Sequence, residues 1–218
     1  MAPLSPPADP ARALIEAARK QVGVTVLYDS AYVRLAYPGG DVPLERGVCA
    51  DVIVRAYRRL GVDLQVLVHE DMLAAWTEYP KRWGLSHPDA NIDHRRVPNL
   101  ATFFFRHGKV LKASRKPADY APGDIVTWTL PGGLPHIGIV TDQRSESGVP
   151  LVIHNVGEGA RGVGQWRRRQ HEPKQQQRRQ VHAALPHPWR RPAPPARPLG
   201  RLPPRALARR AGASSILR

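Results

Sequence analysis

The sequence predicts an α+β fold in which helices come first and an antiparallel sheet follows. Apolar residues recur at helical spacing in the segments that begin at Asp9 and at Cys49. From Tyr120 onward the pattern changes to short runs rich in Val and Ile that are separated by turns. Helices followed by strands, rather than alternating with them, are typical of the α+β class.

The first part of the chain is predicted to be mainly helical. Residues 1–8 are rich in proline and are expected to be loose. Asp9 and Pro10 provide an N-cap and a first-turn proline for a helix that stops at Gly23. A short strand at 24–28 and a turn-rich loop lead to a second helix, which begins at Cys49 and ends before Gly61. The apolar stripe of this second helix leaves its arginines outside; the stripe consists of Val52, Ile53, Ala56, Tyr57 and Leu60, and the arginines are Arg55, Arg58 and Arg59.

Two further helices and three strands complete the predicted domain, which covers residues 9–160. A helix is expected over residues 69–78, with Met72, Leu73 and Trp76 in the core, and a shorter one from Asn99, with its three phenylalanines in the core. The segment between them, residues 81–96, is irregular and polar. The strands are APGDIVTWTL after its turn, HIGIVTD and PLVIHNVG, with QRSESG as the hairpin loop between the last two.

The C-terminal segment, residues 161–218, is predicted to be a disordered basic tail. It holds 15 Lys and Arg residues against one acid, Glu172, so it carries nearly all of the formal net charge of +15. Arg, Pro and Gln dominate it, and such sequence cannot bury enough apolar surface to offset its ordering entropy. The abrupt change near residues 158–161 suggests an altered reading frame or a degraded gene end. Because it shows no nucleic-acid-binding motif, we expect only non-specific binding to polyanions.

The sequence predicts neither a membrane-spanning protein nor one with a visible export signal. A membrane span needs roughly 18 consecutive apolar residues, and no run approaches that length. The N-terminus lacks the apolar core of a signal peptide. The chain is therefore expected to lack a transmembrane segment and a visible export signal.

Cys49 is the only cysteine, and it stands at a predicted helix start. Backbone N–H groups and the helix dipole favour a thiolate at such a position. Imidazoles from the later strands, His136 and His154, supply what a cysteine nucleophile needs. A lone cysteine is also commonly a small buried hydrophobe. Metal binding by these three residues is a further alternative, but no closely spaced ligand pair supports it, so no metal or cofactor is predicted.

Several phrases together carry a family resemblance: YDSAYVRLAYPGGDVPLERGVC, NIDHRRVPNL, PGDIVTWTLPGGLPHIGIV and VIHNVG. Across residues 11–159 the chain resembles the NlpC-type branch of the papain-like cysteine peptidases and, within it, an uncharacterised YijF-type bacterial family. The resemblance implies a papain-like fold, with N-terminal helices packed on a small antiparallel sheet.

The resemblance also implies roles for particular residues. Cys49 would be the nucleophile and His136 the general base, with His154 or Asn155 orienting the base. Neighbouring residues of a strand face opposite sides, so His154 and Asn155 cannot both point at His136. The backbone N–H of Cys49 would contribute to an oxyanion hole, and Tyr37 would lie beside the nucleophile.

Four more residues are candidates for substrate binding. The family's acid before the cysteine is missing here, and Asp51 follows it instead. Asp93, His94 and Arg95 lie together with Arg96 in NIDHRRVP, a group that can bind an anion such as a substrate carboxylate. A solvated, salt-bridged loop explains this cluster more simply, because exposed charges are weak evidence for a site.

The function that follows from the resemblance is a cysteine hydrolase, an amidase or endopeptidase. It would cleave amide bonds of peptides or peptidoglycan fragments through a thioester intermediate. The resemblance places such a protein in the periplasm or cell envelope, although no signal peptide is visible. The alternative is a catalytically inactive envelope-binding module of the same fold.

Overall fold

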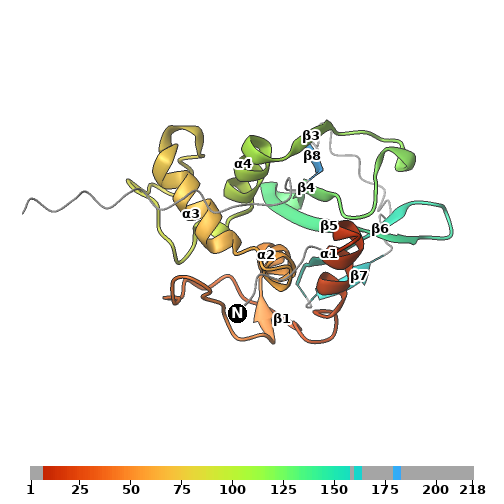
Figure 1. The fold of residues 1–218 in the computed structure, drawn as a ribbon, viewed down its shortest axis with the longest axis horizontal. Coiled ribbons are helices and arrows are strands. Elements are labelled where there is room, and N and C mark those ends of the chain that lie inside the picture. Colours follow the sequence, from red (N-terminus) through yellow and green to blue (C-terminus); the bar gives the residue numbers. More distant parts are fainter. Residues whose placement is uncertain (1–6, 158–159, 164–178, 183–218) are drawn as a thin grey trace, which may run out of the picture.

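The computed structural model describes residues 7–157, 160–163 and 179–182. The α-helices are α1 (Pro10–Arg19), α2 (Cys49–Arg59), α3 (Leu64–Ala74) and α4 (Val97–His107). Short 3-10 helices occur at η1 (Trp76–Glu78), η2 (Asp93–Arg95), η3 (Pro117–Asp119) and η4 (Pro131–Gly133). The strands are β1 (Leu27–Tyr28), β2 (Arg46–Gly47), β3 (Lys109–Lys112), β4 (Ile125–Leu130), β5 (Leu134–Arg144), β6 (Pro150–Asn155), β7 (Ala160–Val163) and β8 (Arg179–His182). The α+β class is thus confirmed (Figure 1).

Helix α1 begins as the sequence predicts. Asp9 is its N-cap, and the side chain of Asp9 accepts a hydrogen bond from the backbone N–H of Arg12 at 3.0 Å. Leu14, Ile15 and Ala18 are buried, and the helix ends at Arg19, so Val22 lies beyond it and is exposed.

Helix α2 occupies the centre of the molecule, beside α1 and against the sheet (Figure 1). Its predicted stripe is buried except for Leu60, which is half-buried just beyond the helix end, but one of the arginines expected outside the stripe is buried too. Arg55 is only 6% exposed and pairs with Asp41 at 2.9 Å. Its guanidinium also donates to the backbone carbonyls of Val42, Pro43 and Arg46. Because these contacts satisfy the charge, the arginine can enter the core and brace the preceding loop against α2.

Helices α3 and α4 differ from prediction in their bounds and in two side chains. Helix α3 starts at Leu64, where Asp63 caps it, and it ends at Ala74 before the turn of η1. Met72 is buried as expected, but Leu73 is 61% exposed. In α4, Phe103 and Phe104 are fully buried, whereas Phe105 is 56% exposed. Successive residues of a helix lie about 100° apart, so three phenylalanines in a row cannot all face one core.

In the described part of the chain, six strands form an antiparallel sheet in the order β3-β8-β4-β5-β6-β7. β4 and β5 pair without a bulge, from Ile125 opposite Ile139 to Leu130 opposite Leu134. One face of the sheet presents Ile125, Ile137, Ile139 and Ile153 to a core shared with α1, α2 and α4. The opposite face carries Trp128, His136 and His154, because side chains alternate along each strand.

Strand β8, and strand β7 after Ala160, lie in residues 161–218, which the sequence predicts to be a disordered tail. β7 pairs with β6, and β8 pairs with β3 and β4. The sheet therefore extends past the predicted domain end at residue 160. The sequence did not predict these strands, because the segment is rich in Arg and lacks a strand pattern. The predicted reading-frame change and the rest of the tail, like residues 1–6, lie outside the described residues.

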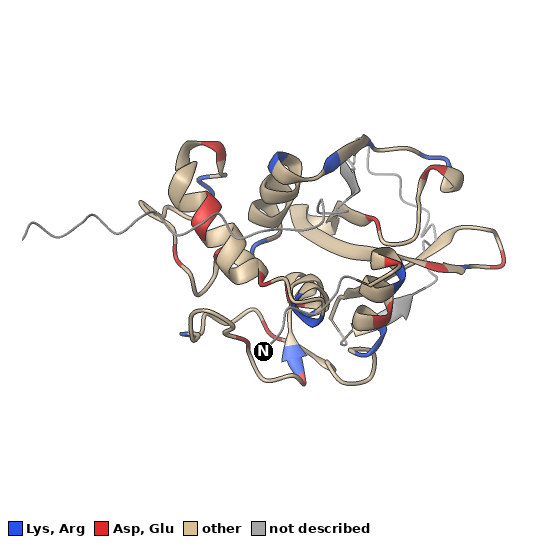
Figure 2. Cartoon of the chain, in the orientation of Figure 1, with Lys and Arg blue, Asp and Glu red and all other residues tan. Residues whose placement is uncertain are grey.

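The loop between α1 and α2 is held by few strand pairs and shows many apolar side chains. β1 and β2 form a two-residue parallel ladder in which Tyr28 lies opposite Gly47. Exposed apolar residues gather here: Val22, Val24, Val26, Leu27, Tyr28, Tyr32, Val33, Tyr37 and Leu44. Elsewhere acidic and basic residues are interspersed over the described elements (Figure 2). Within the described residues, no helix has the length and apolar character required to cross a bilayer.

Candidate functional site

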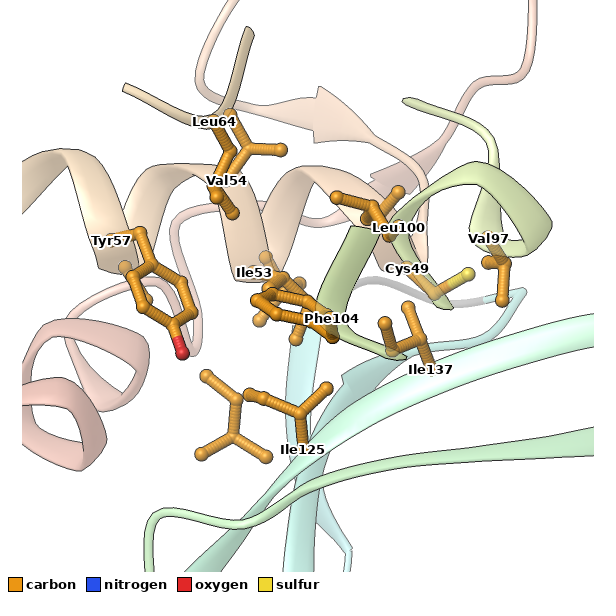
Figure 3. Packing of buried hydrophobic residues seen from close by; sticks show 14 of the residues in the cluster. Cys49, Ile53, Val54, Tyr57, Leu64, Val97, Leu100, Phe104, Ile125 and Ile137 are labelled. Atoms are coloured by element: carbon orange, nitrogen blue, oxygen red, sulfur yellow. The ribbon is translucent and has the colours of Figure 1, made fainter. Parts of the chain in front are cut away.

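Cys49 is the first residue of α2, as the sequence predicts. The side chain of Asp51 fixes this helix start, because Oδ2 accepts a hydrogen bond from the backbone N–H of Val48 at 2.6 Å. The thiol is only 2% exposed. It belongs to the same buried cluster as Val97 and Leu100 of α4 and Ile137 of β5, and Figure 3 shows it among them.

The surroundings of Cys49 act on its ionisation in opposite directions. Burial raises the pKa of the thiol to about 12, whereas the nearby backbone N–H groups of Ile137 and Ala50 lower it. The sequence predicts that the helix start favours the thiolate, and the N–H of Ala50 in the first turn of α2 acts in that direction. Burial outweighs both N–H groups because the charged sulfur would lose its hydration. In this state Cys49 is a neutral thiol.

His136 and His154 lie in contact on the face of the sheet away from α2. A hydrogen bond joins Nε2 of His136 and Nδ1 of His154 at 3.0 Å. Trp128 packs edge-on against both, with ring centroids 4.7 Å from His136 and 5.4 Å from His154. Burial lowers the pKa of His136 to about 3 and that of His154 to about 4. Both rings are therefore neutral at pH 7, a state in which one donates to the other.

His154 and Asn155, the two candidates for the residue that orients His136, point to opposite faces of the sheet, as the alternation of side chains along a strand requires. His154 contacts His136, whereas Asn155 points to the α2 side of the sheet. There its Nδ2 donates to the backbone carbonyl of Gly47 at 2.9 Å. The structure brings His154 to the predicted base, and it uses Asn155 to hold the backbone two residues before Cys49.

Cys49 and His136 are close along the sheet, but they do not touch. The sulfur lies near the N–H of Ile137, which belongs to the peptide that joins His136 to Ile137. Ile137 faces α2, so the imidazole of the preceding residue points to the other face. Among the described residues, no hydrogen bond links Cys49 with either histidine.

Tyr37, predicted to lie beside the nucleophile, instead packs edge-on against His69 with ring centroids 5.5 Å apart. A different tyrosine lies near Cys49. The pKa of Tyr28 is raised, first by burial and then by the negative charges that Cys49 and Asp51 carry when ionised. The sequence contained no signal for Tyr28, because its place follows from the pairing of β1 with β2.

Asp51 and Arg95, both predicted as substrate-binding candidates, form an ion pair with each other. Nε of Arg95 lies 2.9 Å from Oδ1 of Asp51, and both side chains are almost fully buried. Arg95 also donates to the backbone carbonyls of Ala31 and Asp29. The pair ties η2 and the loop before α2 to the helix start. The simpler prediction of a solvated, salt-bridged loop is right about the ion pair and wrong about the solvation, because the pair is buried in the core.

The other two candidates in that cluster are also buried. Oδ2 of Asp93 is 2.9 Å from Nδ1 of His69. His94 is buried near Arg58, and burial lowers its pKa to about 4. Within the described residues, no three His, Cys, Asp or Glu side chains are grouped so that they could hold a metal ion.

Comparison with known proteins identifies the family. A family model described as a domain of unknown function, DUF1287, matches residues 15–168. The chain is also 60% identical over 148 residues to a protein of Escherichia coli (strain K12) described as uncharacterized protein YijF. The match covers 68% of this chain and 72% of that protein. No solved structure matches the chain. The predicted YijF-type membership is confirmed, and the chain belongs to the DUF1287 family.

Proposed function

We propose that this protein is a cysteine hydrolase of NlpC-type, papain-like ancestry that cleaves amide bonds of bacterial cell-wall peptides. The observation that carries the proposal is the sulfur of Cys49 at the start of α2, beside the peptide N–H that follows His136. His136 is in turn hydrogen-bonded to His154. The nucleophile thus lies on the α2 side of the sheet, and a neutral imidazole with a group that orients it lies on the other side of the same strands, β5 and β6.

The proposed reaction has two stages. His136 takes the proton of Cys49, and the sulfur attacks the carbonyl carbon of the scissile amide. The backbone N–H at the start of α2 stabilises the oxyanion. The C–N bond then breaks, the amine leaves with the proton from His136, and a thioester remains. Water, deprotonated by His136, hydrolyses the thioester and restores the thiol.

This reaction requires that the surroundings of Cys49 and His136 rearrange. A pKa of about 12 on Cys49 and of about 3 on His136 leaves no driving force for proton transfer between them. Admission of water or substrate would relieve the burial that causes both shifts. The imidazole must also reach the sulfur past the intervening peptide. We therefore propose that the described state is a closed resting form.

Hydrolysis of defined peptides tests the proposal. The full chain is incubated with purified cell-wall peptide fragments, and the products and any acyl adduct on Cys49 are identified by mass spectrometry. Cleavage is expected in the native chain, with loss in Cys49→Ala and His136→Gln and a reduced rate in His154→Gln. His87 is an exposed histidine outside this region, so His87→Gln is the matched control and should cleave normally. Equal cleavage by native chain and Cys49→Ala would contradict the proposal.

A second function, a binding module of the same fold without catalysis, is favoured by one observation. Cys49 is buried and lacks a hydrogen bond to His136 among the described residues, which is how a core cysteine behaves. In that case Cys49→Ala would leave the binding of cell-wall peptides unchanged, and neither chain would turn them over. Turnover that depends on Cys49 and His136 would eliminate this alternative.

A further inference from the structure

Strand β1 has one edge that no other strand covers. In the described part of the chain it pairs with β2 alone, at the periphery of the molecule (Figure 1). The backbone N–H of Leu27 donates to the carbonyl of Glu45 at 2.9 Å. The backbone N–H of Asp29 donates to the carbonyl of Gly47 at 3.1 Å. Tyr28 lies between these two donors, so its own N–H and C=O face away from β2.

Tyr28 is the residue of this edge that offers both a donor and an acceptor. The N–H of Val26, the other residue whose backbone faces the open side, already donates to the carbonyl of Glu45 at 2.8 Å. Val26 therefore offers only its carbonyl. A partner strand that is to bond fully with β1 must be centred on Tyr28.

Apolar side chains are exposed on both faces of β1 and along the segment that contains it. Leu27 is 51% exposed and Tyr28 is 43% exposed, although neighbouring residues of a strand point to opposite faces. Seven more apolar side chains between Val22 and Leu44 are 39% to 58% exposed. Together the nine offer an apolar area on the order of 600 Å², which is the upper end for the surface of a monomer.

The charge of this segment argues against a polyanion or a membrane as the partner. Asp29 pairs with Arg46 at 3.2 Å, and Asp41 pairs with Arg55 at 2.9 Å. Arg34 is the remaining charged residue of the segment, and a single cation does not suit nucleic acid or anionic headgroups. Insertion among lipid tails is unfavourable as well, because the open backbone groups of β1 would lose their hydrogen bonds to water.

We propose that two copies of this chain associate through β1, in antiparallel pairing about a twofold axis at Tyr28. In an antiparallel ladder, two residues directly opposite each other can exchange both of their N–H···O bonds. Tyr28 opposite its own copy satisfies both open backbone groups on each chain, so the edge is complementary to itself. A standard interface takes about 800 Å² from each partner, and the exposed apolar segment supplies most of that area.

The association also completes a small sheet. A two-stranded ladder is marginal on its own, and further strands stabilise it. Pairing of β1 with its copy continues the ladder of one chain into that of the other. Arg95 holds the carbonyl of Asp29, the residue after Tyr28, so the dimer and the buried ion pair fix the same stretch of chain. The inference does not depend on the proposed hydrolase function.

Sedimentation velocity of the full chain, between about 1 and 100 µM, tests the pairing. The buffer contains about 0.3 M NaCl, because residues 161–218 carry a large positive charge that must be screened. The native chain is expected to approach twice the 24.2 kDa of one chain as the concentration rises.

A charge exchange at Tyr28 tests where the axis lies. Tyr28→Glu places two carboxylates directly opposite each other and Tyr28→Lys places two ammonium groups there, so each variant alone should remain monomeric. An equimolar mixture of the two should regain the dimer, because opposite charges then meet across the axis. Leu73 is an exposed apolar residue of α3, outside the segment, so Leu73→Glu and Leu73→Lys are the matched controls and should each dimerise like the native chain.

A native chain that stays monomeric up to about 100 µM would overturn the inference, and if that monomer sediments with phosphatidylcholine vesicles, the apolar segment binds a membrane instead. Dimerisation of either Tyr28 variant alone, or a mixture of folded variants that stays monomeric, would overturn it as well. If a variant does not fold, hydrogen exchange of the native chain decides. The amide of Tyr28 should exchange more slowly at the high concentration than at the low one, and equal exchange at both would contradict the pairing.

Discussion

Alkylation of Cys49 at controlled pH tests the closed state directly. The chain has a single thiol, so an alkylating reagent reports on this residue alone. Burial raises the pKa of Cys49 from 9.0 to about 12. At pH 8 the thiolate fraction is then lower by a factor of about 10³ than for an unburied cysteine, because each pKa unit is tenfold. Since the thiolate is the reacting form, we expect the folded chain to react with iodoacetamide at least about 10³ times more slowly.

The assay follows the mass of the intact full chain after stopped reaction with iodoacetamide between pH 6 and 10. The same chain unfolded in urea gives the reference rate at each pH, and it should show the inflection of an ordinary thiol near about 8.5. The folded chain should show no inflection below pH 9. A folded rate close to the unfolded one at pH 7, or an inflection below about 8.5, would refute the closed geometry.

Three further changes test the contacts that surround the site. Asp51→Asn leaves the buried Arg95 without its counter-charge, so we expect a loss of about 3–5 kcal/mol in unfolding free energy, measured in urea. In Gly138→Ala the new Cβ would lie 2.5 Å from a Val152 side-chain carbon and 2.9 Å from a backbone oxygen; we expect β5 and β6 to separate, at a cost of about 1–3 kcal/mol in the same measurement. Acid should also unfold the chain. The folded pKa values of about 3 for His136 and about 4 for His154 lie below the ordinary 6.5. Below pH 6.5 the unfolded state therefore binds more protons than the folded state. The free energy of unfolding then falls by about 1.4 kcal/mol per pH unit for each of these histidines, down to about pH 4.

Two of these tests have a control, and each of the three has an outcome that would contradict it. Asp142 pairs with Arg19 at an exposed position, so Asp142→Asn should cost less than about 1 kcal/mol; an equal loss in Asp51→Asn would mean that its pair is not a buried one. A Gly138→Ala chain as stable as the native one would contradict the close approach of β6. Replacing both site histidines by Gln should reduce the acid slope and leave the part that belongs to His94, whose pKa burial also lowers to about 4, whereas His87→Gln should not change the slope. A slope that is the same in all three chains would place the proton uptake elsewhere.

The sequence predicted well those features that depend on neighbouring residues. The cap at Asp9, the start of α2 at Cys49 and the strands β4 to β6 all follow from local patterns, and the structure contains them. The contact of His136 with His154 also follows, because strand pairing brings the two segments together. Local periodicity fixes which face of an element a residue occupies once the element is known.

The sequence could not predict contacts that depend on distant segments. Arg55 appeared polar, yet Asp41 and three carbonyls draw it into the core. Asp51 and Arg95 are 44 residues apart and find each other only in the folded chain. Tyr28 reaches the neighbourhood of Cys49 through the β1–β2 pairing, while Tyr37, twelve residues before the cysteine, packs on His69. Ion pairs between distant residues and the paths of loops produce no periodic pattern in the sequence.

The bracing of α2 determines which parts of the molecule can give access to Cys49. Arg55 fastens the middle of this helix to the loop before it, and Asp51 with Arg95 fastens its first turn. In native-state hydrogen exchange, the amides of α2 should therefore open only with global unfolding. The segment from Val22 to Leu44, with its exposed apolar side chains and its two-residue ladder, should exchange far sooner. Entry to the sulfur would then require that this segment release the carbonyls held by Arg55 and Arg95, while the helix that carries the thiol stays in place.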